Sequence, residues 1–126
     1  MSKIAILSDI HSNLPALKAV LAEVRECGAD RLVFGGDTVG YGAQPKECVD
    51  LVRRLGGESV LGNHDHYTRR VSKQPGLVAD DSWRDQPVLA GIAHAARHLS
   101  AADLDWLGGL EMMIALPGAV LAHASL

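Results

Sequence analysis

Three short apolar segments follow one another along this chain, and a stretch of helical length separates each from the next. Residues 3–8, 31–34 and 58–61 are continuous apolar runs containing isoleucine and valine, which is typical of strands buried on both faces. The stretches between them place apolar residues at helical spacing. Strand, helix and strand in alternation favour an α/β fold, with a mainly parallel sheet flanked by helices.

Capping and breaking residues mark the ends of the two expected helices. Ser12 or Asn13 can cap the first helix, and Pro15 suits its first turn. Gly28 ends that helix, since glycine accepts the left-handed backbone that follows a last turn. Pro45 begins the second helix.

The second half of the chain is less regular. Residues 88–99 show a helical pattern, and Ser100 or Asp103 is a suitable cap for a short helix after them. Residues 111–116 and 119–122 are expected to form a hairpin. Residues 67–86 have no strong period, so a short helix and a long loop near the site both remain open there.

Composition limits the classes of protein. With 126 residues, 48% hydrophobic and 21% charged, the chain is expected to form one ordered domain over residues 1–126. A net charge of −3 gives no footprint for nucleic acid, and the apolar runs are too short to span a membrane. The N-terminus has no signal-peptide pattern, and Cys27 and Cys48 form no CxxC pair. We therefore expect a cytoplasmic protein with reduced thiols.

Ligand-type side chains follow each expected strand where it ends. In open α/β sheets, ligands bind beyond the carboxyl ends of the strands, so these side chains are expected to meet at one rim. They are Asp9 and His11 after the first strand, Asp37 after the second, Asn63, His64 and Asp65 after the third, and His123 after the last.

Each of these motifs is weak by itself, because Asp-x-His and Gly-Asp are common at ordinary turns. Their conjunction is not explained by turns. Carboxylates, imidazoles and an amide without thiolates favour Mn²⁺, Fe or Zn²⁺ over a structural zinc site. His66 is expected to be exposed on a loop. His94 and His98 have helical spacing but no third ligand in register, which indicates a helix face.

The order of these motifs resembles the calcineurin-like metallophosphoesterases. The match consists of Asp9-x-His11, Gly36-Asp37, the run GNHD at 62–65, and His123 after a strand. The stretches SDIHSNLPALKAVL, GGDTVGYGAQPKECVDLV and LSAADLDWL are similar to the bacterial phosphodiesterase branch of that superfamily.

The resemblance implies an α/β/β/α sandwich and two divalent metal ions, with Mn²⁺ as the first choice and Fe or Zn²⁺ as alternatives. It implies that Asp9 and His11 bind the first metal, that Asp37 bridges both, and that Asn63 and His123 bind the second. His64 would act beside the substrate as an acid or orienting group, and Asp65 would hold the His64 ring. The implied substrate is a small phosphate ester, a phosphodiester in preference, attacked by a hydroxide that the two metals activate.

The chain departs from the family pattern because it has no Gly-His-x-His motif. We therefore expect an incomplete, N-terminal part of the domain that binds metal weakly. An open sheet edge would favour a homo-oligomer.

Two other functional classes of protein share some of these features. A non-catalytic module that binds metal or phosphate in a regulatory or scaffolding role stays open. A receiver-type signalling domain is disfavoured, because no lysine occurs after Lys73.

Overall fold

A computed structural model describes residues 2–124 and has the α/β character expected from the sequence. Two short 3₁₀ helices, at Pro75–Val78 and Asp81–Asp85, follow the third α-helix. In chain order the other elements are β1 (Ile4–Leu7), α1 (Leu14–Cys27), β2 (Arg31–Phe34), α2 (Pro45–Arg54), α3 (Asn63–Lys73), α4 (Pro87–His98), α5 (Ala101–Gly108), β3 (Met113–Leu116) and β4 (Ala119–Ala122).

The strands β1 and β2 pair in parallel, with Ile4 opposite Arg31 and Leu7 opposite Phe34. The third expected strand, at residues 58–61, is reduced to single parallel bridges from Ser59 to Phe34 and from Val60 to Glu111. The segment still pairs on both sides, since Phe34 N–H donates to the Glu58 carbonyl and Leu61 N–H donates to the Glu111 carbonyl, both at 2.8 Å. The carboxyl ends of β1, β2 and this short segment still meet at one edge.

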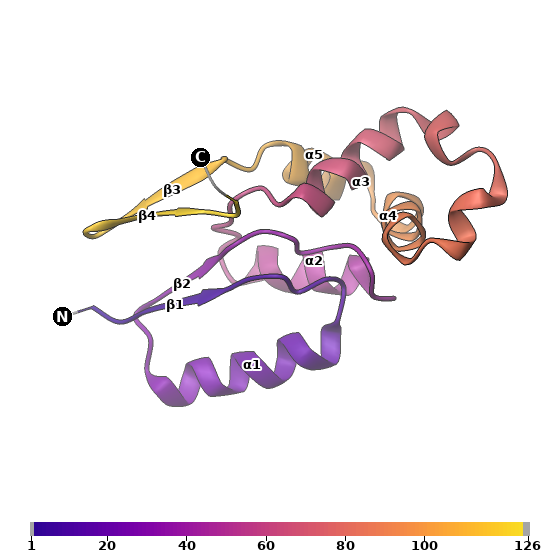
Figure 1. Ribbon diagram of the computed structural model, residues 1–126. Coiled ribbons are helices and arrows are strands. Elements are labelled where there is room, and N and C mark those ends of the chain that lie inside the picture. The colour runs from indigo at the N-terminus through magenta and orange to yellow at the C-terminus, as the bar shows by residue number, and fades with distance from the viewer. Residues whose placement is uncertain (1, 125–126) are drawn as a thin grey trace.

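Helices α1 and α2 bury their apolar sides with the strands. Leu17 and Leu21 from α1 share a core with Leu7, Phe34 and Val52. Figure 1 shows α1 running beneath β1 and β2, with the β3–β4 hairpin above them. The expected caps of α1 are present, since the Asn13 side chain accepts a hydrogen bond from Ala16 N–H and Gly28 has a φ of 63°.

Helix α3 begins at Asn63, one of the expected ligand residues, and extends to Lys73. The first part of residues 67–86 is therefore helical. Helix α4 packs beside α3 and continues the layer of helices at the right of Figure 1. The Trp83 ring, from the second 3₁₀ helix, packs into a core between α3 and α4. The segment is therefore compact helical structure and not a long loop.

The expected hairpin is present, with β3 antiparallel to β4 and Met113 opposite Ala122. The first strand begins at Met113 and not at Glu111, since Glu111 makes only the bridge to Val60. The second strand has the expected bounds, 119–122. Over residues 2–124 the strands form two two-stranded sheets, and a four-layer sandwich is not seen among them. Within the same residues, no helix has the length and apolar character to cross a membrane.

Candidate metal centre

Two loops, one after β1 and one after β2, build the centre and lie against each other. The backbone N–H groups of Asp9, His11 and Ser12 donate to carbonyl groups of residues 36–38, at 3.0, 2.9 and 3.0 Å. These hydrogen bonds extend the β1–β2 pairing into irregular backbone. They fix the spacing between the side chains that the two loops present.

The same two loops contain strained backbone. Over residues 2–124, the non-glycine residues with left-handed φ are confined to these loops, and each such residue costs on the order of 1–3 kcal/mol. They are Asp9 (57°), His11 (49°), Ser12 (58°), Asp37 (55°) and Tyr41 (52°). Strain of this kind persists where surrounding contacts enforce it, and it is concentrated at functional sites.

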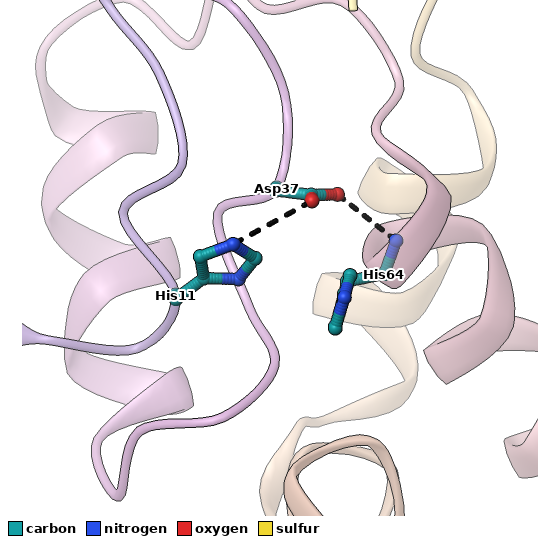
Figure 2. Close-up of side chains that lie close together, drawn as sticks. All are labelled: His11, Asp37 and His64. Atoms are coloured by element: carbon teal, nitrogen blue, oxygen red, sulfur yellow. Dashed lines mark hydrogen bonds and ion pairs between the residues drawn. The ribbon is translucent and has the colours of Figure 1, made fainter. Parts of the chain in front are cut away.

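The Asp37 carboxylate lies at the middle of the centre. Its Oδ1 accepts a hydrogen bond of 2.9 Å from the backbone N–H of His64, as Figure 2 shows. Its Oδ2 lies 3.7 Å from His11 Nε2 and 3.2 Å from His123 Nε2. One carboxylate oxygen therefore faces two imidazoles from opposite ends of the chain, as a bridging ligand would.

The His11 ring is oriented by a backbone carbonyl. Its Nδ1–H donates to the carbonyl of Val39 at 3.2 Å, which leaves the Nε2 lone pair free in a neutral ring. That Nε2 lies 3.5 Å from Asp9 Oδ1 as well as near Asp37. Asp9 and His11 are thus neighbours, as the sequence predicts.

His123 is held in the same way. Its Nδ1–H donates to the Gly35 carbonyl at 2.7 Å, and its Nε2 lies 3.1 Å from Asn63 Oδ1. Burial would lower the pKa of His123, but the hydrogen bond to Gly35 and the charge of Asp37 raise it. Asn63 and His123 therefore share one side of Asp37.

The donor set fits two cations. In the neutral tautomer in which Nδ1–H donates, the Nε2 of each imidazole would present a lone pair to oxygen atoms that can only accept. A cation or a proton on Nε2 would balance each cluster. Ligand atoms lie within 4.8 Å of one another in two groups that share Asp37, namely His11, Asp37 and His64, and Asp9, Asp37 and His123.

His64 is buried at the start of α3, and its ring lies edge-on to the His11 ring with centroids 4.8 Å apart. Burial lowers the pKa of His64, and the negative charge of Asp37 opposes that effect. The ring Nδ1 is buried without a hydrogen-bond partner among the described residues. The ring therefore lies beside the proposed metal ligands with its own nitrogen unsatisfied.

The expectation that Asp65 holds the His64 ring is wrong for this structure. The fully buried Asp65 carboxylate accepts hydrogen bonds from three backbone N–H groups, of Asp37 (2.8 Å), Val39 (3.2 Å) and Gly62 (3.1 Å). Burial raises the pKa of Asp65 to about 6, while these N–H groups act in the opposite direction. Asp65 lies in the first turn of α3, where its carboxylate reaches the backbone of the Asp37 loop. These hydrogen bonds anchor the Asp37 loop to α3.

The remaining histidines lie outside this cluster. His66 is exposed, as expected, but it lies on α3 and not on a loop, and its ring meets the Tyr67 ring edge-on with centroids 5.7 Å apart. His94 and His98 lie along α4 with ring centroids 4.1 Å apart, and they belong to neither of the two ligand groups. His94 Nε2–H donates instead to the carbonyl of Ala43, at 2.9 Å.

An open cleft of about 670 Å³ gives access to the centre. Asp9 and His11 line it, together with Tyr41. No local pattern reveals the backbone carbonyls of Gly35 and Val39 that orient the two imidazoles, because a carbonyl carries no residue signature.

The comparisons with known proteins agree with this geometry. The family model of the calcineurin-like phosphoesterases matches residues 2–113. The uncharacterized protein MJ0912 of Methanocaldococcus jannaschii is 55% identical over 65 residues, which are 52% of this chain and 27% of that protein.

Two solved structures are similar over most of the chain. A metallophosphoesterase from Sphaerobacter thermophilus is 36% identical with a TM-score of 0.69, over 91% of this chain and 44% of its own. A protein described as a "putative diadenosine tetraphosphatase" is 30% identical with a TM-score of 0.77, over 99% of this chain and 51% of its own. The chain thus spans about half the length of these two solved structures, and a smaller part of the archaeal relative.

Proposed function

This chain belongs to the calcineurin-like phosphoesterase family, and from that premise we propose that its centre serves metal-dependent hydrolysis of phosphate esters. One observation supports the proposal above the others. Asp37 Oδ2 lies between His11 Nε2 and His123 Nε2, at 3.7 and 3.2 Å, so one carboxylate oxygen can serve two cations. The family uses divalent metals, and this donor set suits them.

The ligand assignment follows the two sides of Asp37. Asp9 and His11 would hold one cation, since His11 Nε2 points toward both carboxylates. Asn63 and His123 would hold the other through the amide oxygen and Nε2. Of the possible metals, Mn²⁺ is the one we propose first, with Fe or Zn²⁺ as alternatives, because oxygen and imidazole ligands accept all three.

Bound divalent cations supply two effects in such sites: they bring the pKa of water down towards 7, and they offset negative charge on phosphate oxygens. The chain supplies orientation. Val39 and Gly35 fix the tautomers of His11 and His123, which keeps each Nε2 free to bind. His64 lies beside this pair, where its ring can orient or protonate the leaving oxygen of the ester.

A phosphodiester is the substrate class that we propose in preference to a monoester. The local sequence around the motifs is similar to the bacterial phosphodiesterase branch. The name of one solved relative, which attributes diadenosine tetraphosphate cleavage to that protein, also points to substrates with groups on both sides of the phosphate. The open cleft beside Asp9 and Tyr41 has room for such a second group. A purely regulatory module is not favoured, because the family that the chain belongs to is one of phosphoesterases.

The test compares bis-p-nitrophenyl phosphate with p-nitrophenyl phosphate as substrates of the full-length gene product, with and without Mn²⁺. We expect Mn²⁺-dependent release of p-nitrophenol, faster from the diester, and its loss in Asp37→Asn. Asp105→Asn, on the exposed side of α5, is the matched control and should keep the wild-type rate. No metal-dependent rate above background with either substrate would contradict the proposal.

A further inference from the structure

We propose that Tyr41 is a positioning residue that fixes the orientation of the His64 ring. The two ring centroids are 4.8 Å apart and the planes are inclined by 36°. Tyr41 also meets the His11 ring edge-on, with centroids 4.9 Å apart and planes at 85°. The three rings therefore form one cluster in which Tyr41 touches both imidazoles.

The histidines of the centre differ in what orients them. The His11 and His123 rings each donate Nδ1–H to a backbone carbonyl, of Val39 and Gly35 respectively. The His64 ring makes no hydrogen bond to any described residue, and its Nδ1 is buried without a partner. Its orientation therefore depends on packing against the Gly40 backbone, the His11 ring and the Tyr41 ring, of which Tyr41 is the largest side chain.

The backbone at Tyr41 is strained. Its φ is 52°, in the left-handed region where glycine is the least strained residue. Burial of the side chain does not explain the choice of tyrosine, because 51% of the residue is exposed. The aromatic rings that the Tyr41 ring contacts are those of His64 and His11.

The loop that holds Tyr41 is fixed from two sides. Helix α4 presses on it at Gly91, where a Cβ atom would lie 2.1 Å from the Tyr41 backbone nitrogen. His94 of the same helix donates to the Ala43 carbonyl at 2.9 Å. From the other side, Gly42 N–H donates to the His11 carbonyl at 2.9 Å. The backbone that carries the Tyr41 ring is thus held in place.

The catalytic meaning of this support rests on the proposed function, in which His64 acts on the leaving oxygen. A ring that acts on one oxygen must point in one direction, and small errors in placement slow such steps strongly. Whether the His64 ring loses its fixed orientation when the Tyr41 ring is removed can be tested without turnover.

The experiment uses the 126-residue chain with ¹³C-labelled histidine rings and follows ring-to-ring NOEs by NMR. In Tyr41→Gly, the NOE between His64 and His11 is expected to disappear and the His64 ring signals to broaden. His11 and His123 should keep their signals, because their carbonyl partners are untouched. The midpoint of thermal unfolding should not fall, since glycine relieves the strained φ.

Two variants complete the design. Tyr41→Phe keeps the ring and is expected to retain the His64–His11 NOE. Tyr67→Ala removes the other tyrosine, which stacks near His66, and should leave His64 unchanged. An unchanged NOE in Tyr41→Gly, or its equal loss in Tyr41→Phe, would overturn the inference.

In the full-length gene product, Tyr41→Gly should lower kcat at least tenfold with metal affinity unchanged, and Tyr41→Phe should restore it. Absence of any hydrolysis there would refute the proposed function, and the NMR result would still decide the role of Tyr41.

Discussion

At the scale of single residues, the two oxygens of Asp37 have different tasks. Oδ1 is tied to the backbone N–H of His64, which prevents the carboxylate from rotating. Oδ2 is thereby held between His11 and His123. The backbone N–H of Asp37 is in turn held by Asp65. The position that we propose for a bridging ligand is thus fixed by hydrogen bonds within the chain, which would reduce the ordering that binding a cation requires.

Gly62→Ala tests how closely the chain must approach Asp37. A Cβ atom at Gly62 would lie 2.1 Å from Asp37 Oδ1 and 2.2 Å from its backbone nitrogen, so the carboxylate must move. We expect a loss of about 1–3 kcal/mol in the free energy of unfolding and about tenfold weaker metal affinity. Gly76→Ala is the control, since nothing lies within 4 Å of its Cβ position. Calorimetry measures the free energy of unfolding and the Mn²⁺ affinity of each variant. Similar values for Gly62→Ala and Gly76→Ala would show that the close approach of Gly62 to Asp37 is not required.

Asp65→Asn tests the anchor between the Asp37 loop and α3. The amide keeps one acceptor oxygen and presents N–H groups where backbone N–H groups already point. We expect a loss of about 2–3 kcal/mol, because buried donors are left unsatisfied. Chemical denaturation measures it, with Asp105→Asn as the exposed control. A loss no larger than that of the control would show that the three backbone hydrogen bonds contribute little.

The convergence of the site residues is the part that the sequence predicts best. Asp9, Asp37 and Asn63 meet because the carboxyl ends of neighbouring parallel segments share one edge, and strand and helix alternation is visible in the sequence. The partners of Asp65 were not predictable in the same way. They are backbone N–H groups, which any residue type provides, so no side-chain pattern announces them.

At the scale of elements, the start of α3 cannot be recognised from an apolar pattern in the sequence. The buried positions of this helix are His64, Asp65, Thr68 and Val71, which have helical spacing. Three of these four are polar, so an apolar pattern gives no signal there. The remaining signal is an acidic residue at the third position of the first turn, Asp65, whose carboxylate accepts from Gly62 N–H.

Helices α2 and α5 are joined by a buried carboxylate. Asp103 is fully buried and lies 3.0 Å from Lys46 Nζ and 2.9 Å from Arg53 NH1, both of α2. It also caps α5, accepting from Ser100 N–H at 3.0 Å. Burial alone would raise the pKa of Asp103, but the hydrogen bonds from Ser100 and the charge of Lys46 lower it below the ordinary 3.8. The ionised form is therefore favoured by folding.

Asp103→Asn is expected to lower the free energy of unfolding by about 1–3 kcal/mol at pH 7. The pH dependence has a definite sign, because the unfolded chain takes up a proton at Asp103 at higher pH than the folded chain. The difference between wild type and variant should be fully present well above pH 3.8 and should shrink as pH falls through the lowered pKa. Urea unfolding at several pH values measures this. A difference that stays constant down to pH 3 would contradict it.

At the scale of the whole molecule, the described residues leave apolar strand surface exposed. In the hairpin, Met112 is 67% and Val120 is 62% exposed, and β4 pairs only with β3. On the other sheet, β1 pairs only with β2. Such edges and patches favour association with another chain.

We therefore propose that the 126-residue chain self-associates. Light scattering after size exclusion should give a mass that rises with concentration, and Val120→Lys should lower it by charging the exposed face. Lys18→Glu, on exposed α1, is a control for a change of charge elsewhere. A monomer at every concentration would refute the proposal.

We propose that Asp37 serves two metal sites at once. The most direct measurement is a Zn²⁺ titration of the chain with ¹⁵N-labelled histidine rings, in which Zn²⁺ is a diamagnetic probe. The account predicts that the Nε2 signals of both His11 and His123 move to metal-bound positions while their Nδ1 atoms stay protonated, and that Asp37→Asn weakens both shifts together. A shift at only one of the two rings, or an Asp37→Asn variant that binds Zn²⁺ as the wild type does, would contradict it.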